Sequence, residues 1–344
     1  MNLKKWLRNT VMVGVLVIPL MLTGCGFLSK SSEAIDPPQD EQTTDSPTSW
    51  LEQNEGGDNY QVYLQDRNGY LAPIALPVVL NEELAVGQQL LELMVDGGLY
   101  AAMMPGEFRA LIPQGTEILN YEVAEEVATV NFSEPFVNYN EADERAIVES
   151  IVYTLTSLEG IKGVAIQVNG EAIEEMPMAG YPLAQVIDRA IGINIEIAAG
   201  VNYSQASPVT LYFSGQTLDA EQYFVPVTRM INREQSNVVA AINQLSQGPL
   251  DAKSLAPVMM DDVEVVSYEI YDDVLHVDLQ DESYEPGVFV PADMLNAIIL
   301  SLIDNTDVAA VQLRVNGDIN IFDENNLSYS TPVTKPEYVN ALKL

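Results

Sequence analysis

Apolar residues recur along the chain with two different spacings, which together predict the order of helices and strands. Two stretches repeat apolar residues about every 3.6 positions, a spacing typical of a helix that buries one side. They predict two long helices, with buried positions Ile147, Val148, Ile151, Val152, Leu155 and Leu158 in one and Met294, Leu295, Ile298, Ile299, Leu302 and Ile303 in the other. Pro291 suits the first turn of the later helix.

Shorter apolar runs between turn residues predict strands. Two pairs of runs open the two halves of the chain, at 60–64 with 71–80 and at 209–213 with 223–230. Asn68-Gly69 favours a hairpin between the first two runs, and the prolines inside the runs favour edge strands.

A shorter helix and three more strands complete each half. The short helices stop at Gly97-Gly98 and at Gly248-Pro249, and acidic pairs, Glu125-Glu126 and Asp272-Asp273, mark the turns between the next two strands. The last strands are 163–168 and 310–315. The order β-β-α-β-β-α-β predicts an α+β fold in which two helices pack on one face of a sheet.

The two halves are copies of each other. A shift of 268 − 121 = 147 positions aligns Tyr121-Glu122 with Tyr268-Glu269 and Val168-Asn169-Gly170 with Val315-Asn316-Gly317, and no gap is needed between positions 119 and 170. A two-copy array of units this long indicates paired domains rather than a solenoid. The predicted segments are a lipoprotein signal peptide (1–24), a lipid anchor with a disordered tether (25–58), a first domain (59–176), a structured connector (177–207), a second domain (208–323) and a C-terminal extension (324–344).

Two of these segments carry a structural expectation of their own. Apolar residues alternate from Ile191 to Ile197 in the connector, which predicts a strand packed between or against the two domains. The extension is polar, so we expect it to lie along the surface or to fray.

Residues 1–24 have the layout of a bacterial lipoprotein signal. Three basic residues precede an apolar run from Val11 to Met21, which has about half of the ~20 residues that span a bilayer. Leu22-Thr23-Gly24-Cys25 follows, and the Cys25 thiol can accept a diacylglyceryl group. We expect lipidation at Cys25 and a folded part that stands outside the cytoplasm; an ordinary cleaved signal that ends near a cysteine is the alternative.

The charge excludes nucleic acid as a partner. Fifteen Lys and Arg against 50 Asp and Glu give 15 − 50 = −35, whereas nucleic-acid binding needs clustered bases. Hydrophobic residues make up 47% of the chain, so it is a folded acidic protein rather than an acidic disordered one.

Few residues are suited to catalysis or to a cofactor. His276 is the single histidine, and its place in an alternating strand makes a solvent-facing residue the better explanation than a catalytic base. Clustered His and Cys for zinc and a calcium loop are both missing from the sequence, so we expect no metal and no cofactor. Glycosidase chemistry needs only two carboxylates, so wall cleavage stays an alternative, whereas the parallel lobes of a solute-binding lipoprotein do not fit.

One loop differs in length between the two copies. The first copy has 113 − 97 = 16 positions between the first helix and the next strand, where the second has 257 − 248 = 9. The longer loop carries Tyr100, Met103 and Met104, which are candidate partner contacts because Met and Tyr often line adaptable interfaces; capping of the core is the alternative.

Several motifs resemble GerMN domains. They are Val130-Asn131-Phe132-Ser133-Glu134-Pro135-Phe136, Thr154-Leu155-Thr156 and Val168-Asn169-Gly170-Glu171. Together with Glu33 to Asp40, Gly106 to Ala110, Gly192-Ile193-Asn194 and Tyr223 to Thr228, they make the whole chain similar to the GerM family of sporulation and germination lipoproteins of endospore-forming bacteria. The second copy departs from the pattern, with Asp278 in place of Asn131 and Ser301 in place of Thr154.

The resemblance implies a non-enzymatic lipoprotein required for sporulation, with effects on germination. It implies an anchor in the outer forespore membrane, facing the intermembrane space, and a role in assembling a channel between mother cell and forespore. The units are also similar to ring-building motifs of secretion systems, which implies a scaffold for channel proteins and allows a ring or homo-oligomer. A lipoprotein that binds or hydrolyses peptidoglycan is the alternative.

Overall fold

The computed structural model describes residues 58–259 and 263–341, and the predicted order of elements is confirmed in both repeats. The first repeat contains strands β1 (Asp58–Asp66), β2 (Leu71–Val78), β3 (Phe108–Arg109), β4 (Ile118–Ala124), β5 (Val127–Phe132), β6 (Gly163–Val168) and β7 (Glu171–Ala172), and helices α1 (Val86–Leu93) and α2 (Glu144–Leu155). Short 3-10 helices cover Ala101–Met103, Glu134–Val137 and Glu141–Asp143.

The second repeat has the same order. It contains strands β9 (Ala206–Gln216), β10 (Gln222–Asn232), β11 (Val263–Tyr271), β12 (Val274–Asp281), β13 (Ala310–Val315) and β14 (Val333–Thr334), and helices α3 (Asn237–Ser246) and α4 (Ala292–Thr306). Between the repeats lie β8 (Glu196–Ile197) and 3-10 helices at Arg189–Ile191 and Tyr203–Gln205.

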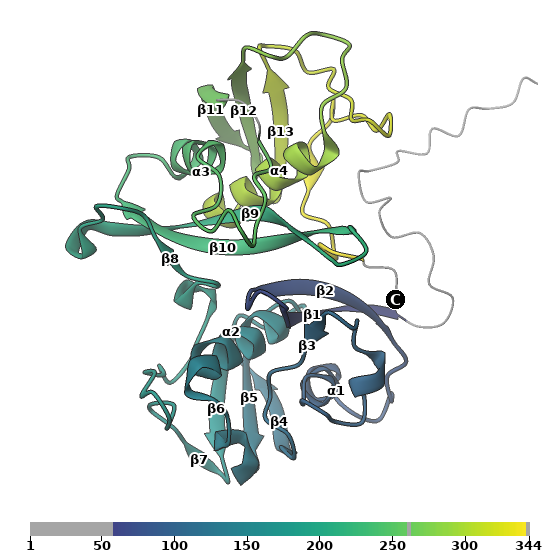
Figure 1. Cartoon of the computed structure of the whole chain (residues 1–344), viewed down its shortest axis with the longest axis vertical. Coiled ribbons are helices and arrows are strands. Elements are labelled where there is room, and N and C mark those ends of the chain that lie inside the picture. The colour runs from purple at the N-terminus through teal and green to yellow at the C-terminus, as the bar shows by residue number, and fades with distance from the viewer. Residues whose placement is uncertain (1–57, 260–262, 342–344) are drawn as a thin grey trace, which may run out of the picture. The chain divides into compact units, whose positions relative to one another are not determined.

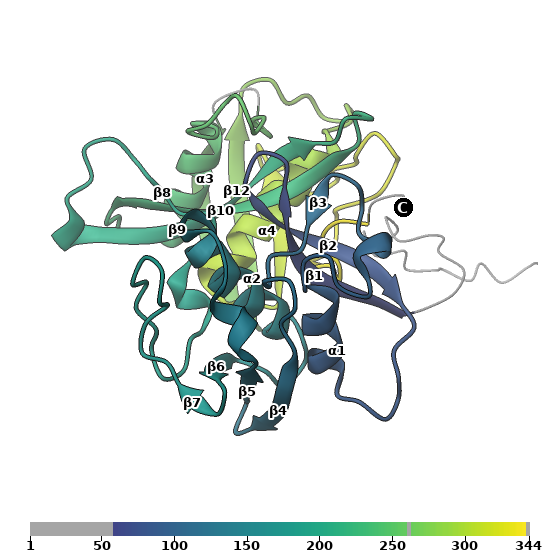
Figure 2. The ribbon, with the colours of Figure 1, turned by 60° about the horizontal axis from the view of Figure 1, so that its bottom comes forward.

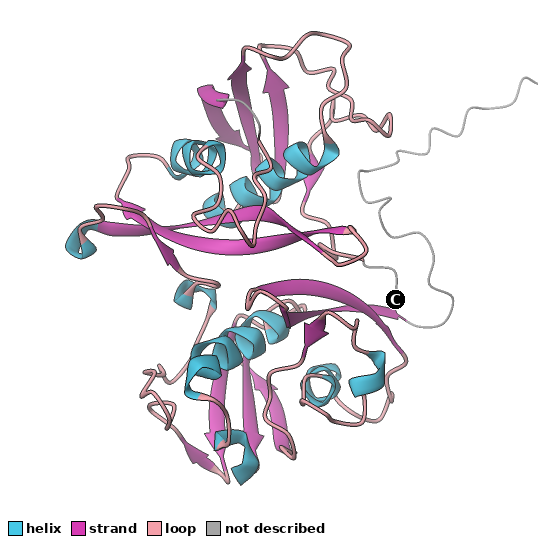
Figure 3. Cartoon of the chain, viewed as in Figure 1, coloured by secondary structure: helices cyan, strands magenta, loops and turns pink. Residues whose placement is uncertain are grey.

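Each repeat has three layers. The first two strands form an antiparallel hairpin, and the later strands form a second sheet in the order β4-β5-β6-β7 or β11-β12-β13-β14. The helices cover one face of this second sheet, as expected, and the hairpin covers their other side (Figures 1 and 3). Figure 2 shows this layering for the first repeat, where α1 lies beside β4. The helices are therefore buried between two sheets, which explains why so many of their apolar residues are inaccessible.

A hydroxyl on the long helix ties it to the hairpin in both repeats. The Thr154 hydroxyl accepts the backbone N–H of Tyr63 at 2.9 Å, and the Ser301 hydroxyl accepts that of Tyr212 at 3.1 Å. Because a buried N–H without a partner is costly, either hydroxyl amino acid serves at this position. The exchange of Thr154 for Ser301 therefore keeps the contact.

The exchange of Asn131 for Asp278 also preserves a hydrogen bond. The Asn131 side chain accepts the N–H of Gly170 at 2.8 Å, and the Asp278 carboxylate accepts that of Gly317 at 3.0 Å. Both glycines have positive φ, 84° and 80°, in the turn after the last long strand. Asn and Asp share the acceptor oxygen that this turn needs.

The acidic pairs form the tight turns that their sequence predicts. Glu125 and Glu126 have φ of 50° and 64°, and Asp272 and Asp273 have φ of 51° and 62°. Two successive positive φ values make a two-residue hairpin turn whose twist matches that of the strands. A β-bulge recurs as well, between Ile118 and Asn120 in β4 and between Val265 and Ser267 in β11.

The connector differs from the predicted strand. Only Glu196 and Ile197 are in a strand, β8, which pairs in parallel with β10. Asn194 has a φ of 48°, which breaks the extended run. The alternating isoleucines do not share one buried face, since Ile193 is buried while Ile197 is 46% exposed.

The C-terminal extension was expected to lie on the surface or fray, and this expectation is wrong for its described part. Strand β14 pairs with β13 through Val333, and Tyr329, Val339 and Asn340 are buried. The polar composition is misleading because one of its polar side chains, that of Asn340, is buried and binds the backbone of β2 and β10.

Candidate functional site between the two repeats

The predicted site residues lie in different surroundings. Cys25 is outside the described residues. Tyr100 and Met104 are half-buried and pack against the core, and Met103 ends a 3-10 helix. Leu99, next to them, is 96% exposed, and sequence reasoning missed it. Whether this loop meets a partner stays a prediction.

His276 lies on β12 between the buried residues Leu275 and Val277. Its ring stacks on that of Tyr271 with the centroids 3.9 Å apart, and the Tyr271 hydroxyl lies 3.3 Å from Nδ1. The ring therefore packs on a tyrosine of the neighbouring strand, where Glu269 is the cross-strand neighbour of His276.

Asn194 joins the two repeats through one side chain. Its amide nitrogen donates to the carbonyl of Leu71 on β2 and to that of Pro226 on β10, both at 2.7 Å. Its side-chain oxygen accepts the N–H of Leu71 at 2.8 Å. The side chain therefore takes the place of a backbone ladder between strands of different repeats.

Asn340 repeats this arrangement from the C-terminal segment. Its amide nitrogen donates to the carbonyls of Pro73 on β2 and Phe224 on β10, both at 2.8 Å, and its oxygen accepts the N–H of Phe224. Its own carbonyl accepts the N–H of Ala75. Two asparagines thus bind the same two strands, and we call them the asparagine clasp.

Tyr223 of the second repeat adds a further contact with the first repeat, near the end of β1. The Tyr223 hydroxyl donates to Asp66 at 2.8 Å, and the Tyr223 ring meets Phe108 edge to face at 5.1 Å. Burial, followed by the Asp66 carboxylate, raises the pKa of Tyr223. Gly215 lies opposite Tyr223 in the β9–β10 register, and a Cβ there would come within 2.6 Å of the ring. Glycine therefore leaves the space that the tyrosine fills.

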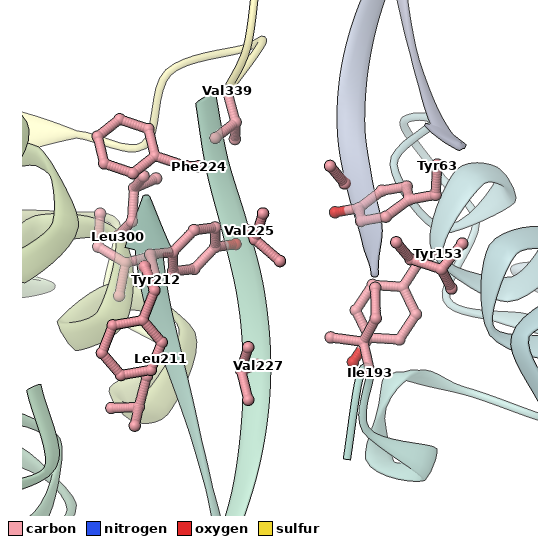
Figure 4. Packing of buried hydrophobic residues seen from close by; sticks show 14 of the residues in the cluster. Tyr63, Tyr153, Ile193, Leu211, Tyr212, Phe224, Val225, Val227, Leu300 and Val339 are labelled. Carbon is pink, nitrogen blue, oxygen red and sulfur yellow. The ribbon is translucent and has the colours of Figure 1, made fainter. Parts of the chain in front are cut away.

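A half-buried ionic cluster lies on the second-repeat side. Asp304 on α4 accepts the Tyr212 hydroxyl at 2.7 Å and forms an ion pair with Lys335 of the C-terminal segment. Burial acts to raise the pKa of Asp304, but Lys335, Tyr212 and the more distant Arg189 outweigh it and hold that pKa below its usual value. Figure 4 shows Tyr212 with Leu300 of α4 and, in the first repeat, Tyr63 beside Tyr153.

The connector is fixed to both repeats by arginines. Arg189 donates to Thr156 at 2.8 Å and covers the Tyr153 ring at 4.9 Å. Arg229 on β10 is fully buried, donates to Glu196 at 2.6 Å and donates to the carbonyl of Gly248 at 2.8 Å, just past the end of α3. A cation suits the C-terminal end of a helix, where carbonyls lack partners.

Two buried carboxylates in the first repeat are fully engaged as acceptors. Glu149 binds Arg145 and accepts the N–H of Asn194 at 3.0 Å, and burial raises its pKa. For Glu144, burial also acts to raise the pKa, but hydrogen-bond donors prevail and lower it. The donors are the Tyr139 hydroxyl and the backbone N–H groups of Met178, Ala179 and Tyr181, at 2.7 to 2.8 Å.

The geometry of this junction suits mechanical connection better than chemistry. Both repeats fall within one compact unit of the chain, and the side chains between them are hydrogen-bonded. Across the described ranges, no group of three His, Cys, Asp or Glu is placed to hold a metal ion. None of the helices described is long and apolar enough to cross a membrane.

Comparison with known proteins agrees with this architecture. A family model described as Germane, sporulation and spore germination, matches residues 61–174 and 210–320. The chain is 33% identical to the spore germination protein GerM of Bacillus subtilis (strain 168) over 349 residues, which cover 93% of this chain and 94% of the relative. The chain belongs to the GerM family.

A solved structure shows the same fold. The tandem GerMN domains of the sporulation protein GerM from Bacillus subtilis match with a TM-score of 0.77 at 34% identity, over 83% of this chain and 99% of that one. Membership of the GerM family supports a role related to sporulation. In the motif Gly192-Ile193-Asn194, the last residue has a structural role, because Asn194 is one of the two asparagines of the clasp.

Proposed function

We propose that this chain is a non-enzymatic, membrane-anchored scaffold that helps to assemble the channel between mother cell and forespore, with effects on germination. The observation that carries the proposal is the junction, where the asparagine clasp and the hydrogen bond from Tyr223 to Asp66 join the two repeats. Two units held at a fixed spacing can position partner proteins relative to each other, which freely moving domains cannot do.

The proposed location is the outer forespore membrane, facing the intermembrane space. Cys25 would carry the lipid, and residues 25–58 would separate the folded part from the membrane. A tether of about 30 residues has a typical reach near ~30 Å. Direct partners would be the channel proteins in that space, and the chain would enter a ring or another assembly there.

The use of the buried carboxylates supports a scaffold over a wall hydrolase. Glu144, Glu149 and Asp304 each bind several donors that belong to the fold. A glycosidase needs a pair of carboxyl groups free to face its substrate across a cleft. Peptidoglycan binding or hydrolysis is the competing function, and the spore yields of variants distinguish it from a scaffold.

The test compares variants in a strain that lacks its own copy. Cys25→Ala should remove palmitate label and lower the yield of heat-resistant spores by about tenfold or more, since lasting attachment depends on the acyl chains. His276→Ala and single exchanges of exposed carboxylates, such as Glu125→Gln, should leave the yield unchanged. One exposed carboxylate whose exchange abolishes sporulation in a folded, membrane-bound protein would favour a hydrolase instead.

A further inference from the structure

The outer strands of the two repeats, β4 and β11, are exposed to different degrees. Each is an edge strand of its sheet. Tyr121 on β4 is half-buried, and a Cβ on Gly87 of α1 would come within 2.1 Å of its hydroxyl oxygen. The helix therefore leaves a recess, at a glycine, in which the tyrosine packs.

The second repeat does not reproduce this cover. The equivalent of Tyr121 is Tyr268, which is 44% exposed. The shift between the short helices is 248 − 97 = 151, so the equivalent of Gly87 is Val238, and its side chain is buried. Four apolar side chains of β11 are 44 to 59% exposed: Val266, Tyr268, Ile270 and Tyr271. Leu119 and Val123, the equivalents of Val266 and Ile270, are 49 and 46% exposed, so the two edges differ in the tyrosine and in Tyr271, which replaces Ala124.

The two edges carry acids at the same four aligned positions but differ in one cation. In the first repeat Lys162 pairs with Glu126 at the turn, at 2.8 Å. The equivalent of Lys162 is Ala309, because 162 + 147 = 309, so the second turn lacks this cation. Within the described part of the chain, no ion pair involves the four acids on or beside β11: Glu264, Glu269, Asp272 and Asp273.

We propose that β11 is a docking edge that accepts an extended segment of a basic partner protein as an added strand. An edge strand offers unpaired backbone groups, and its bulge between Val265 and Ser267 leaves Tyr268 to Tyr271 in regular register. A segment that alternates apolar with Lys or Arg residues would match the exposed apolar side chains and the acids. A second copy of this chain does not fit, because its own β11 would bring acid against acid.

A docking edge on β11 would give the proposed scaffold a site for its partner. It rests on the proposed function only because both require a protein partner. The probe is a labelled eight-residue peptide that alternates lysine and valine, added to the mature chain at low salt. We expect it to bind and to slow hydrogen exchange at the amides of residues 268–271. A glutamate–valine peptide and a lysine–valine peptide with alternate amides methylated should bind at least about tenfold more weakly, since they lose the charge match and the strand ladder respectively.

The chain supplies its own matched control. Ile270 is 52% exposed and its equivalent Val123 is 46% exposed, since 123 + 147 = 270. Ile270→Lys should weaken peptide binding about tenfold or more, whereas Val123→Lys should change it less than about twofold. Circular dichroism would verify that both variants fold.

Three results would overturn the docking edge: no binding, equal loss in both variants, or unchanged affinity of the methylated peptide. The last two would indicate adsorption to an acidic surface. If any of them occurred while Cys25→Ala still lowered spore yield, the docking edge would fail and the scaffold role would stand.

Discussion

The two repeats keep the same contacts inside and differ at their outer edges. Inside, a hydroxyl on the long helix accepts a hairpin N–H, and a side-chain oxygen holds the turn after the last long strand, although the amino acids themselves changed. At the edge, Tyr121 of the first repeat packs against Gly87 and Lys162 pairs with one of the two turn glutamates, whereas Tyr268 of the second repeat is 44% exposed and no lysine occupies the position of Lys162. The difference indicates that the duplicated fold tolerates exchanges that preserve a hydrogen bond, and that the copies diverge more at their edges than at these internal contacts.

The largest effect should come from a residue that only the second repeat uses. Leu76 is the equivalent of Arg229: it pairs with Tyr60 as Arg229 pairs with Val209, and both partners lie three positions before the tyrosine whose N–H binds the long helix. Arg229→Leu should lower the free energy of unfolding by about 3–5 kcal/mol, since it leaves Glu196 and the carbonyls at the end of α3 without their buried cation. Urea unfolding of the purified chain measures this. The exposed Arg233→Leu is the control, and equal stability of the two variants would contradict the role given to Arg229.

The asparagine clasp should have the next largest effect. Asn340→Ala removes the partner of the buried Phe224 N–H and of two carbonyls, so we expect a loss of about 2–4 kcal/mol in the free energy of unfolding. The exposed Asn325→Ala, from the same segment, should cost less than about 0.5 kcal/mol. Small-angle scattering should also report looser repeats in Asn340→Ala, and an unchanged profile with unchanged stability would disprove the clasp.

The stability of the protein should depend on acid pH through Asp304 of the second repeat, which has no titrating equivalent in the first repeat. The pKa of Asp304 is lowered in the fold, so its ionised form stabilises the protein above the unfolded pKa of about 3.9, and this contribution is lost as the pH falls through the lower folded value. Asp304→Asn should therefore make the fall in stability below about pH 4 less steep. Lys335→Met should flatten the acid limb in the same way, because it removes the cation that lowers this pKa. The equivalent of Asp304 in the first repeat is Ser157, which cannot titrate in this range.

The smallest effect concerns the recess at α1. Gly87→Ala should displace the Tyr121 ring at a cost of about 1 kcal/mol or less, because alanine favours the helix while the ring loses its burial. The pKa of Tyr121, which burial raises to about 12, should fall toward 10. Ring-labelled NMR titration would detect the change. An unchanged Tyr121 signal would mean that the recess is not what buries it.

Local patterns could predict the elements of each repeat, but not the junction. Apolar spacing, the acidic turns and the duplication depend on neighbouring residues, so the order of strands and helices was accessible from the sequence. The clasp joins Asn194 to Leu71 over 123 positions and Asn340 to Pro73 over 267 positions, and neither asparagine belongs to a periodic run.

Two interpretations were wrong because polar side chains here bind backbone instead of water. Alternating isoleucines around Asn194 looked like a strand, yet this residue turns away with positive φ to reach two carbonyls. The extension looked like a surface segment because it is polar, yet Asn340 is buried. Hydrophobic pattern alone cannot distinguish an amide that is hydrated from one that completes a ladder.

The position of Asn340 has a consequence for the order of folding. Synthesis begins at the N-terminus, so both hairpins leave the ribosome well before residues 335–340, and the contacts of Asn340 form only after this later segment has emerged. Until then β2 and β10 carry backbone groups that the finished protein satisfies with this segment. A chain truncated before residue 335 would have all its long helices and strands, yet it would leave these backbone groups of β2 and β10 without the side chain of Asn340.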